Sequence, residues 1–277
     1  MWTERRNHKY IASAVLFVVA VMVAWVATVV PSTSIYRTLV RTVWSHGYPG
    51  IAYELNQTDP TLAMAVGNYY FGGGQYNLTR AIDSFQLAVR LDPTILWGHY
   101  QLARIYFVQS HFDRALSEIN AELVANPANL RSLYVRGLIY MYRGRTGDLS
   151  LAATDFEHFI PWAPTEWAGY NDLAFVLAEE GEYAASENIL QEAFIHVPNA
   201  NKNPWIWNGI GLDQLNEHHY AAAKSSFKQA AMFAKTLTLT DWQNAYSADN
   251  PAADASSIAT FQKAIAENLQ IATAKMN

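Results

Sequence analysis

The sequence predicts an all-α protein in which one transmembrane helix precedes an α-solenoid of about five helix pairs and a C-terminal capping helix. Three observations lead to this prediction. An uncharged apolar run covers residues 10–30. Residues 254–275 carry apolar side chains at helical spacing. Between these segments, prolines recur at intervals of 34, 37 and 34 residues, at Pro93, Pro127, Pro164 and Pro198.

The run from Tyr10 to Val30 predicts a transmembrane helix. Its 21 residues span about 30 Å as a helix, which matches the hydrocarbon core of a bilayer. A cleavable signal peptide has an apolar stretch of about 7–15 residues and a small-x-small cleavage site. The best candidate site ends at Ala27 and has Trp25 two places before it. We therefore expect a retained anchor that follows a short basic tail of residues 1–9.

The charges beside this run predict its orientation. Arg5, Arg6 and Lys9 precede it, opposed only by Glu4. The first basic residues on the other side lie farther from the run. Because positive flanks favour the cytosolic side, we expect a cytosolic N-terminus and an extracytoplasmic body. The expected location is a bacterial inner membrane, with the body facing the periplasm or the exterior.

The composition excludes several classes of protein. Hydrophobic residues make up 51% of the chain and charged residues 16%, so disorder is not expected. The net charge of −5 is uneven: residues 31–150 carry about +2 and residues 151–277 about −9. This acidic C-terminal half argues against nucleic acid as a partner. The absence of cysteine excludes disulfides, thiolate nucleophiles and cysteine-based zinc sites.

The proline interval marks five repeated segments, at about residues 60–93, 94–127, 128–164, 165–198 and 199–235. Each segment has a small residue in its first half and a large apolar residue in its second half. The small residues are Gly67, Ala103, Gly137, Ala174 and Gly211. The large residues are Phe85, Ile119, Phe156, Leu190 and Phe227. Small residues let two helix backbones approach each other, and large residues fill the space that remains.

This pattern resembles the tetratricopeptide repeat (TPR), a pair of helices A and B with a closing proline. The resemblance covers about residues 60–235 and implies an α-solenoid. Glu122 and Phe159 depart from it, because they replace the second small residue of helix B. Residues 31–59 are expected to form a helical neck or a degenerate repeat. Residues 236–277 are expected to form a linker and the capping helix, which covers the open face of the last pair.

The resemblance also implies a peptide-binding groove, since helix A lines the concave face in this family. The family's contact positions give the candidate residues Trp97, Tyr100, Arg104, Phe107, Arg131, Tyr134, Leu138, Asn171, Phe175, Trp205, Asn208 and Leu212. Asparagine amides can bond a peptide backbone, and aromatic rings bury apolar side chains at low entropic cost. Packing between neighbouring helices explains the same aromatic residues equally well.

The family's carboxylate clamp is matched only in fragments. Its positions hold Met64, Asn68, Gln101, Arg131 and Val135 instead of a full set of lysine, asparagine and arginine. Recognition of an acidic C-terminus is therefore not expected.

No motif predicts catalysis. Gly72-Gly73-Gly74 is not followed by the Gly-Lys-Ser/Thr of a phosphate-binding loop, and neither H-E-x-x-H nor G-x-S-x-G occurs. His218 and His219 lie in an expected turn, where solvated side chains are the simpler interpretation. We therefore expect that the protein is not an enzyme and that it has no catalytic residue, cofactor or metal.

The leading hypothesis is a membrane-anchored TPR scaffold for protein–protein interaction. It would bind an extended peptide or a partner helix in its groove and assist assembly or secretion at a cell envelope. Nucleic acid and small-molecule substrates are not expected as partners. The alternative is a structural or oligomerisation subunit of a membrane complex, whose groove is filled by its own neck or C-terminal helix.

Overall fold

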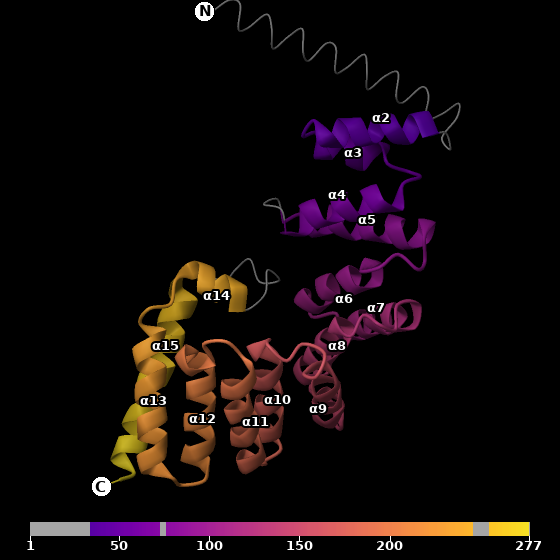
Figure 1. The fold of residues 1–277 in the computed structure, drawn as a ribbon. Coiled ribbons are helices and arrows are strands. Elements are labelled where there is room, and N and C mark those ends of the chain that lie inside the picture. The colour runs from indigo at the N-terminus through magenta and orange to yellow at the C-terminus, as the bar shows by residue number, and fades with distance from the viewer. Residues whose placement is uncertain (1–33, 73–75, 246–254, 277) are drawn as a thin grey trace, which may run out of the picture. The chain divides into compact units, whose positions relative to one another are not determined.

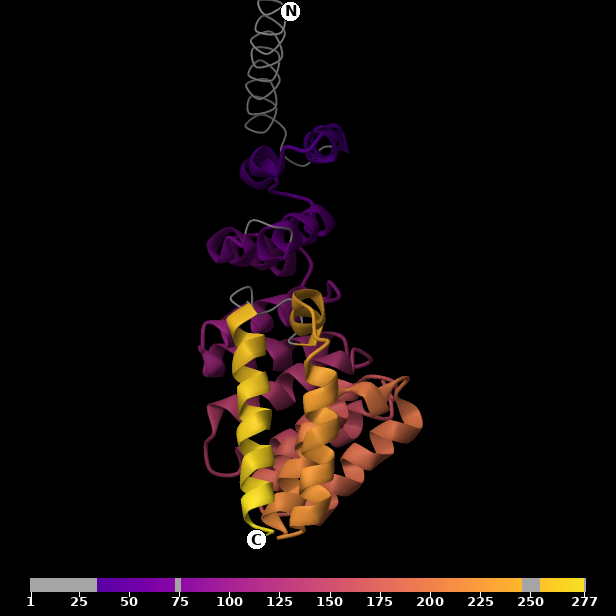
Figure 2. The same cartoon turned by 90° about the vertical axis from the view of Figure 1, so that its left-hand side faces the viewer.

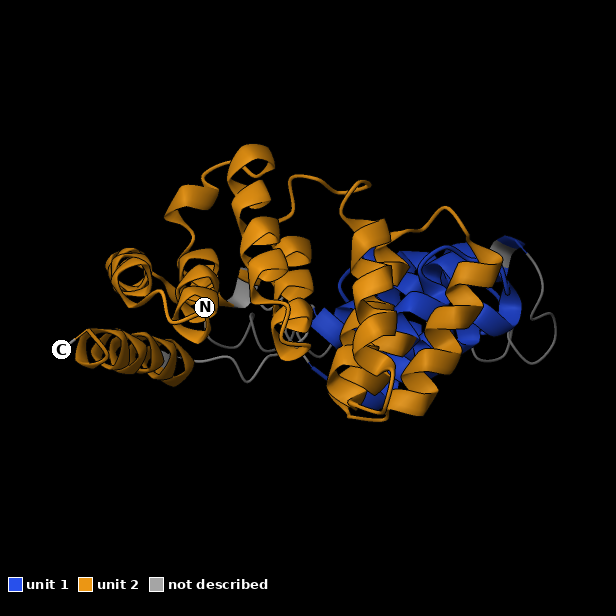
Figure 3. Ribbon diagram, turned by 90° about the horizontal axis from the view of Figure 1, so that it is seen from below, with its two compact units in different colours: residues 1–102 blue, residues 103–277 orange. Residues whose placement is uncertain are grey.

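The computed structural model describes residues 34–72, 76–245 and 255–276, and in these ranges every regular element is a helix. The prediction of an all-α protein is confirmed for this part of the chain. The expected transmembrane helix at residues 10–30 lies outside it. Among the helices in the described ranges, none is both long enough and apolar enough to cross a bilayer. The chain divides into two compact units, residues 1–102 and 103–277 (Figure 3).

Unit 1 consists of short antiparallel helices that follow one another along the chain (Figure 1). They are α2 (Ser34–Ser45), α3 (Pro49–Leu55), α4 (Pro60–Gly72), α5 (Leu78–Leu91) and the beginning of α6 (Gly98–Val108). Side chains tie the first helices together. The Asp59 carboxylate before α4 accepts a hydrogen bond from the Leu62 amide (3.1 Å) and forms an ion pair with Arg41 of α2. The expected neck is thus packed against the first repeat-like helix pair.

Unit 2 continues from α6 with further helix pairs. The elements are α7 (Phe112–Ala125), α8 (Arg131–Arg143), α9 (Asp148–Phe159), α10 (Trp167–Glu179), α11 (Tyr183–His196), η1 (Ala200–Lys202), α12 (Pro204–Asn216), α13 (Tyr220–Ala234), α14 (Leu239–Ala245) and α15 (Ala255–Ala274). Successive helices pack as α8 with α9, α10 with α11 and α12 with α13. Helix α15 runs back along α13, so the C-terminus lies near the turn between α12 and α13 (Figures 1 and 2).

We call the contact between the two helices of one pair its seam, and the seams explain the sequence repeat. A Cβ atom added to Gly137 of α8 would lie only 2.6 Å from the ring of Phe156 on α9. The corresponding distances are 2.5 Å from Gly67 to Phe85 and 2.6 Å from Gly211 to Phe227. All three phenylalanine side chains are fully buried. Glycine is therefore required where phenylalanine fills the seam, because a larger residue would overpack it.

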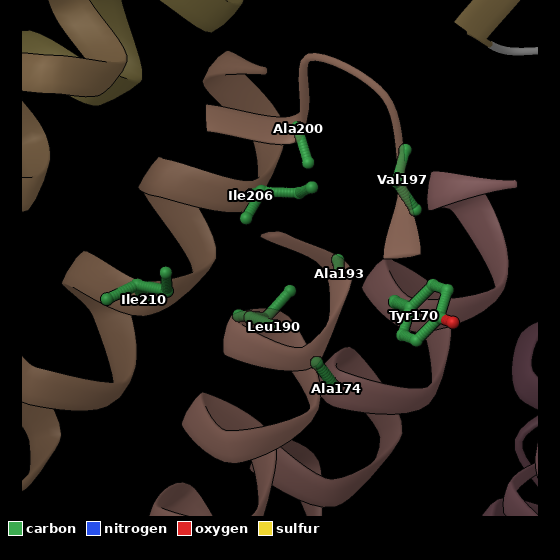
Figure 4. Packing of buried hydrophobic residues seen from close by; sticks show 8 residues of the cluster. All are labelled: Tyr170, Ala174, Leu190, Ala193, Val197, Ala200, Ile206 and Ile210. Carbon is green, nitrogen blue, oxygen red and sulfur yellow. The ribbon is translucent and has the colours of Figure 1, made fainter. Parts of the chain in front are cut away.

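The α10–α11 pair shows a different solution to the same packing problem. Here alanine replaces glycine at Ala174, and the smaller Leu190 replaces phenylalanine. Both side chains belong to one buried cluster in which residues of α10, α11 and α12 converge (Figure 4). The volumes on the two sides of a seam therefore change together.

The two departures from the repeat pattern are accommodated by local contacts. Glu122 is fully buried, and its Oε1 atom accepts hydrogen bonds from the side-chain amides of Asn126 (3.2 Å) and Asn129 (2.9 Å). Phe159 is buried and lies against Tyr134, with 4.9 Å between the ring centroids. A polar group can be buried at this position because hydrogen bonds compensate for its desolvation.

Candidate binding groove

A pocket of about 370 Å³ opens in unit 2 over the first helices of its helix pairs. Residues of α6, α7, α8, α10 and α12 line it, together with Ala245 at the end of α14. Six of its fourteen lining residues are aromatic: Phe107, Phe112, Tyr134, Tyr142, Trp167 and Trp205. We call this site the aromatic pocket.

Helical periodicity explains which residues face the aromatic pocket. On α8 the lining residues include Tyr134, Leu138 and Met141, spaced four and three positions apart. Residues at this spacing lie on one face of a helix. On α10, Ala168 and Asn171 follow the same rule. Helices α8 and α10 therefore each present one face to the pocket.

Among the described residues that line this pocket, Asp172 alone is acidic, and none is lysine, arginine or histidine. The Tyr134 hydroxyl donates a hydrogen bond to its Oδ2 atom (2.8 Å), and the Asn171 amide lies 3.3 Å from its Oδ1 atom. Burial raises the pKa of Asp172 to about 6, although both hydrogen bonds act in the opposite direction. The pocket thus contains a carboxylate whose charge is not balanced by a cation in the described lining.

Aromatic contacts join rings of the pocket wall. Phe107 meets Tyr142 edge to face, with 5.4 Å between the ring centroids. Trp167 stacks on Trp205 at 5.2 Å. Such pairs add stability beyond the burial of their area. The pocket walls are therefore held in place by contacts between side chains from different helices.

The C-terminal segment covers part of the groove beyond this pocket. Trp205 is in contact with Trp242 of α14 at 5.8 Å and stacks on Phe261 of α15 at 5.5 Å. Trp242 itself is buried. Part of Trp205 is therefore covered by the protein's own chain, and only its remaining surface lines the pocket.

The structure brings together five of the twelve residues predicted to form the groove. These five line the aromatic pocket: Phe107, Tyr134, Leu138, Asn171 and Trp205. Asp172 and Trp167 were not among the predicted residues, although Asp172 is adjacent in sequence to the predicted residue Asn171. No signal in the sequence distinguishes these two residues from core positions.

Several other predicted residues lie in unit 2 but outside this pocket. Phe175 and Leu212 are exposed, by 49% and 36%. Asn208 is partly buried, and its Oδ1 atom has no hydrogen-bond partner among the described residues. Arg104 is partly buried in α6.

Arg131 is paired within the protein. It forms an ion pair with Glu166, and its guanidinium lies over the rings of Phe159 (5.6 Å) and Trp162 (5.9 Å). Its charge is thus already compensated, which agrees with the poor match to a carboxylate clamp.

Trp97 and Tyr100 belong to unit 1. Trp97 was expected on a helix, but it precedes α6 with a φ of 72°, in the left-handed region. It packs edge to face on Tyr100, which is buried, with 4.9 Å between the centroids. In the same unit, the Gln101 amide donates to Asn68 (2.8 Å). Tyr100 therefore has a packing role in this structure.

In the described ranges, no group of three or more histidine, aspartate or glutamate side chains is placed to hold a metal ion. The buried acidic groups are explained by other contacts. Asp148 is held by Arg143 at 2.7 Å, and Asp155 by Arg136 at the same distance. Both acidic residues lie on the second helix of their pair, so these ion pairs have a structural role.

Comparison with solved structures shows the same fold. A crystal structure of a MamA protein has a TM-score of 0.55 at 16% identity, covering 64% of this chain and 92% of that one. YrrB, described as a TPR protein with an unusual peptide-binding site, has a TM-score of 0.54 at 16% identity, covering 68% of this chain and 93% of that one. A TPR protein of Thermus thermophilus has a TM-score of 0.50 at 20% identity, covering 69% of this chain and 98% of that one.

No family model and no curated protein matches the chain. At these identities the solved structures show the fold alone. The chain therefore has the fold of TPR proteins, which confirms the all-α, TPR-like solenoid that the sequence predicts.

Proposed function

We propose that this chain is a non-enzymatic scaffold that binds an extended peptide or a partner helix in the groove of unit 2. The aromatic pocket carries the proposal. It is built from the first helices of successive pairs, which present rings and the Asn171 amide to one cavity. Apolar walls with a few polar groups are typical of binding sites. The peptide-binding site of YrrB supports the same use of this fold.

The proposal includes a membrane tether. The uncharged run at residues 10–30 supports it, because its length matches a bilayer core. Tethering raises the local concentration of a binding module near membrane complexes, so modest affinity is sufficient. With the body on the extracytoplasmic side, the scaffold would assist assembly or secretion at a cell envelope.

Photo-crosslinking tests the groove. A photoreactive phenylalanine analogue is placed at position 138 or 171 of the full chain in native membranes, and adducts are identified by mass spectrometry. Position 195 is the matched control, because Ile195 is 78% exposed on α11 and does not line the aromatic pocket. We expect discrete adducts with another protein from positions 138 and 171 only. Identical adducts from all three positions, or none from any, would contradict the proposal.

The tether is tested separately by extraction. The full chain should remain in the membrane pellet after alkaline carbonate treatment, and a chain lacking residues 10–30 should be released. Protease added to intact spheroplasts should cleave the body and leave the N-terminus protected. Release of the full chain by carbonate would contradict the anchor, and protection of the body would contradict the orientation.

One observation favours the second candidate, a subunit whose groove is occupied by its own chain. Trp242 and Phe261 already contact Trp205, and Ala245 lines the aromatic pocket. In that case, crosslinks from position 138 or 171 should join residues 239–245 of the same chain. Replacement of Trp242 by alanine then separates the candidates. If α14 competes with a ligand, Trp242→Ala should increase the yield of adducts with another protein. If the groove serves only internal packing, this variant should give no such adducts.

A further inference from the structure

The polar group inside the aromatic pocket indicates what kind of side chain it receives. We propose that the pocket binds the side chain of a lysine or arginine from the partner segment, with Asp172 as its counter-ion and the surrounding rings as its walls. This inference rests on the proposed function, and it specifies the chemistry of the ligand.

The charge of the pocket is the first argument. Asp172 is the one acidic residue in the lining that the structure describes, and that lining holds no cationic residue. Of the other carboxylates buried in unit 2, Asp148 and Asp155 accept hydrogen bonds from an arginine guanidinium. Glu122 and Asp213 accept from neutral amide and hydroxyl groups, but neither residue lines the aromatic pocket. An uncompensated, partly buried carboxylate is unfavourable, and a ligand cation would supply the missing partner.

The hydrogen bonds to Asp172 leave room for that cation. Tyr134 donates to the Oδ2 atom at 2.8 Å, which orients the carboxylate. The Oδ1 atom faces the Asn171 amide at 3.3 Å. A carboxylate offers about four acceptor sites, so its remaining lone pairs can accept hydrogen bonds from an ammonium or guanidinium group.

The rings supply the second interaction. Tyr142 and Trp167 both line the pocket, and their faces attract a cation placed within about 6 Å. Tyr142 is close enough to Asp172 for the carboxylate to contribute to the raised pKa of its hydroxyl, after burial, which is the main cause. A ligand cation at Asp172 would therefore also be near an aromatic ring.

The size of the pocket limits the ligand part it can hold. A volume of about 370 Å³ is near the lower end of ligand pockets, which range over about 300–1,000 Å³. It accommodates one long side chain and its stem, while the backbone of the ligand lies outside. Leu138 and Met141 give the aliphatic stem an apolar surface. The net charge of about −9 on residues 151–277 favours the approach of a basic segment.

The test uses four fluorescent nonapeptides that differ only at the central residue, which is arginine, lysine, citrulline or norleucine. Citrulline has the shape of arginine without its charge. Binding to the purified full-length chain in non-ionic detergent is measured by fluorescence anisotropy at pH 7.5. We expect the arginine and lysine peptides to bind about tenfold more tightly than the two neutral peptides. Asp172→Asn should abolish this difference.

A matched control removes the same charge elsewhere on the same helix. Glu179→Gln changes an exposed residue at the end of α10 and should leave the tenfold preference intact. If Asp172→Asn does not fold, the pair Tyr142→Phe and Tyr142→Leu replaces it, because Tyr142 is 61% exposed and tolerates replacement. The phenylalanine variant should keep the preference, and the leucine variant should reduce it several-fold.

Three results overturn the inference in distinguishable ways. If all four peptides bind equally and Asp172→Asn has no effect, the pocket does not recognise charge, while peptide binding in the groove stands. Equal losses in Asp172→Asn and Glu179→Gln would show attraction by net charge alone and would also overturn it. If none of the peptides binds, the inference is wrong, and crosslinking from positions 138 and 171 decides the proposed function independently.

Discussion

In the seam of each helix pair, a small residue on the first helix faces a large residue on the second, and this combination recurs along the chain. In the aromatic pocket, rings come from several helices, but among the described lining residues the acidic side chain comes from α10 alone. Gly137 and Phe156 have counterparts in two other pairs, whereas Asp172 has none among the described lining residues. The seams determine how the chain folds. Residues that line the pocket can differ from one helix to the next without changing the packing of the seams.

This difference predicts which substitutions change stability and which change binding. Side chains in the seams are fully buried and have volumes matched across the contact. Pocket side chains are partly open to solvent. Substitutions in a seam should therefore destabilise the protein, and substitutions in the pocket should leave its stability nearly unchanged.

The largest expected effect comes from emptying a seam. Phe156→Ala removes a ring that is 0% exposed and should lower the free energy of unfolding by about 3–5 kcal/mol. The matched substitution Phe175→Ala removes a ring that is 49% exposed on α10 and should cost less than about 1 kcal/mol. Urea unfolding followed by circular dichroism measures both. Similar losses in the two variants would erase the distinction between seam and groove.

The next effect depends on pH and arises between successive pairs. Asp213 of α12 is buried and accepts a hydrogen bond from Ser186 of α11 (2.7 Å). Burial raises its pKa to about 7, and Glu187 and Glu217 contribute to the increase. The folded state therefore holds a proton that the unfolded state releases near pH 4. The stability that this proton contributes is fully present below about pH 4 and is lost as the pH rises toward 7.

The size of this effect follows from the pKa difference. One pKa unit corresponds to about 1.4 kcal/mol, so the loss is at most about 4 kcal/mol across that range. Asp213→Asn should remove this dependence, because a neutral amide replaces the titrating group. Urea unfolding at pH 4, 5.5 and 8 measures it. Asp241→Asn is the control, because Asp241 has the opposite pH dependence. Hydrogen bonds from Thr238 lower the pKa of Asp241, so the stability that it contributes is lost as the pH falls. An unchanged pH profile in Asp213→Asn would refute the assignment.

A smaller effect tests the volume rule directly. Gly137→Ala places a Cβ atom 2.6 Å from the Phe156 ring and should cost about 1–3 kcal/mol. Adding Phe156→Leu recreates the alanine and leucine combination that the α10–α11 pair already uses at Ala174 and Leu190. The double variant should therefore be more stable than the sum of the single losses predicts. Additive losses in this cycle would show that the two volumes are not coupled.

The sequence predicts the seams well because their physical requirement leaves a periodic pattern. Gly67, Gly137 and Gly211 lie where a helix backbone approaches a phenylalanine ring, so spacing and residue size both mark them. This is why the all-helical, TPR-like fold can be predicted without a structure. The order of the helices in the repeated segments follows from the same pattern.

The pocket was only partly predictable for the opposite reason. Asp172 stands between Asn171 and Leu173 in a helix whose neighbouring residues are mostly apolar, and one residue of rotation decides whether it faces the core or the groove. Its environment also depends on Tyr134, 38 positions away in the sequence. The contact of Trp242 with Trp205 is equally non-local. It involves a segment, α14, in which the repeat pattern is already weak.

The smallest expected effect on stability is at the pocket itself. Tyr134→Phe deletes the hydroxyl that donates to Asp172 at 2.8 Å and keeps the ring. Stability should change by less than about 1 kcal/mol, because the partner carboxylate lies at an open pocket where water can replace the hydroxyl. The pKa of Asp172, now about 6, should rise, since the lost hydrogen bond stabilised the ionised form. A carbon-13 NMR titration of the carboxyl groups measures this change.

Peptide binding tests the Tyr134→Phe variant in a second way. A protonated Asp172 cannot act as a counter-ion, so Tyr134→Phe should weaken binding of the arginine peptide more at pH 6 than at pH 8. Tyr183→Phe deletes a hydroxyl on α11, outside the pocket lining, and should leave both the pKa and the binding unchanged. If Tyr134→Phe weakens binding equally at both pH values, the Tyr134 hydroxyl contacts the ligand directly. In that case the hydroxyl does not act by positioning the Asp172 carboxylate.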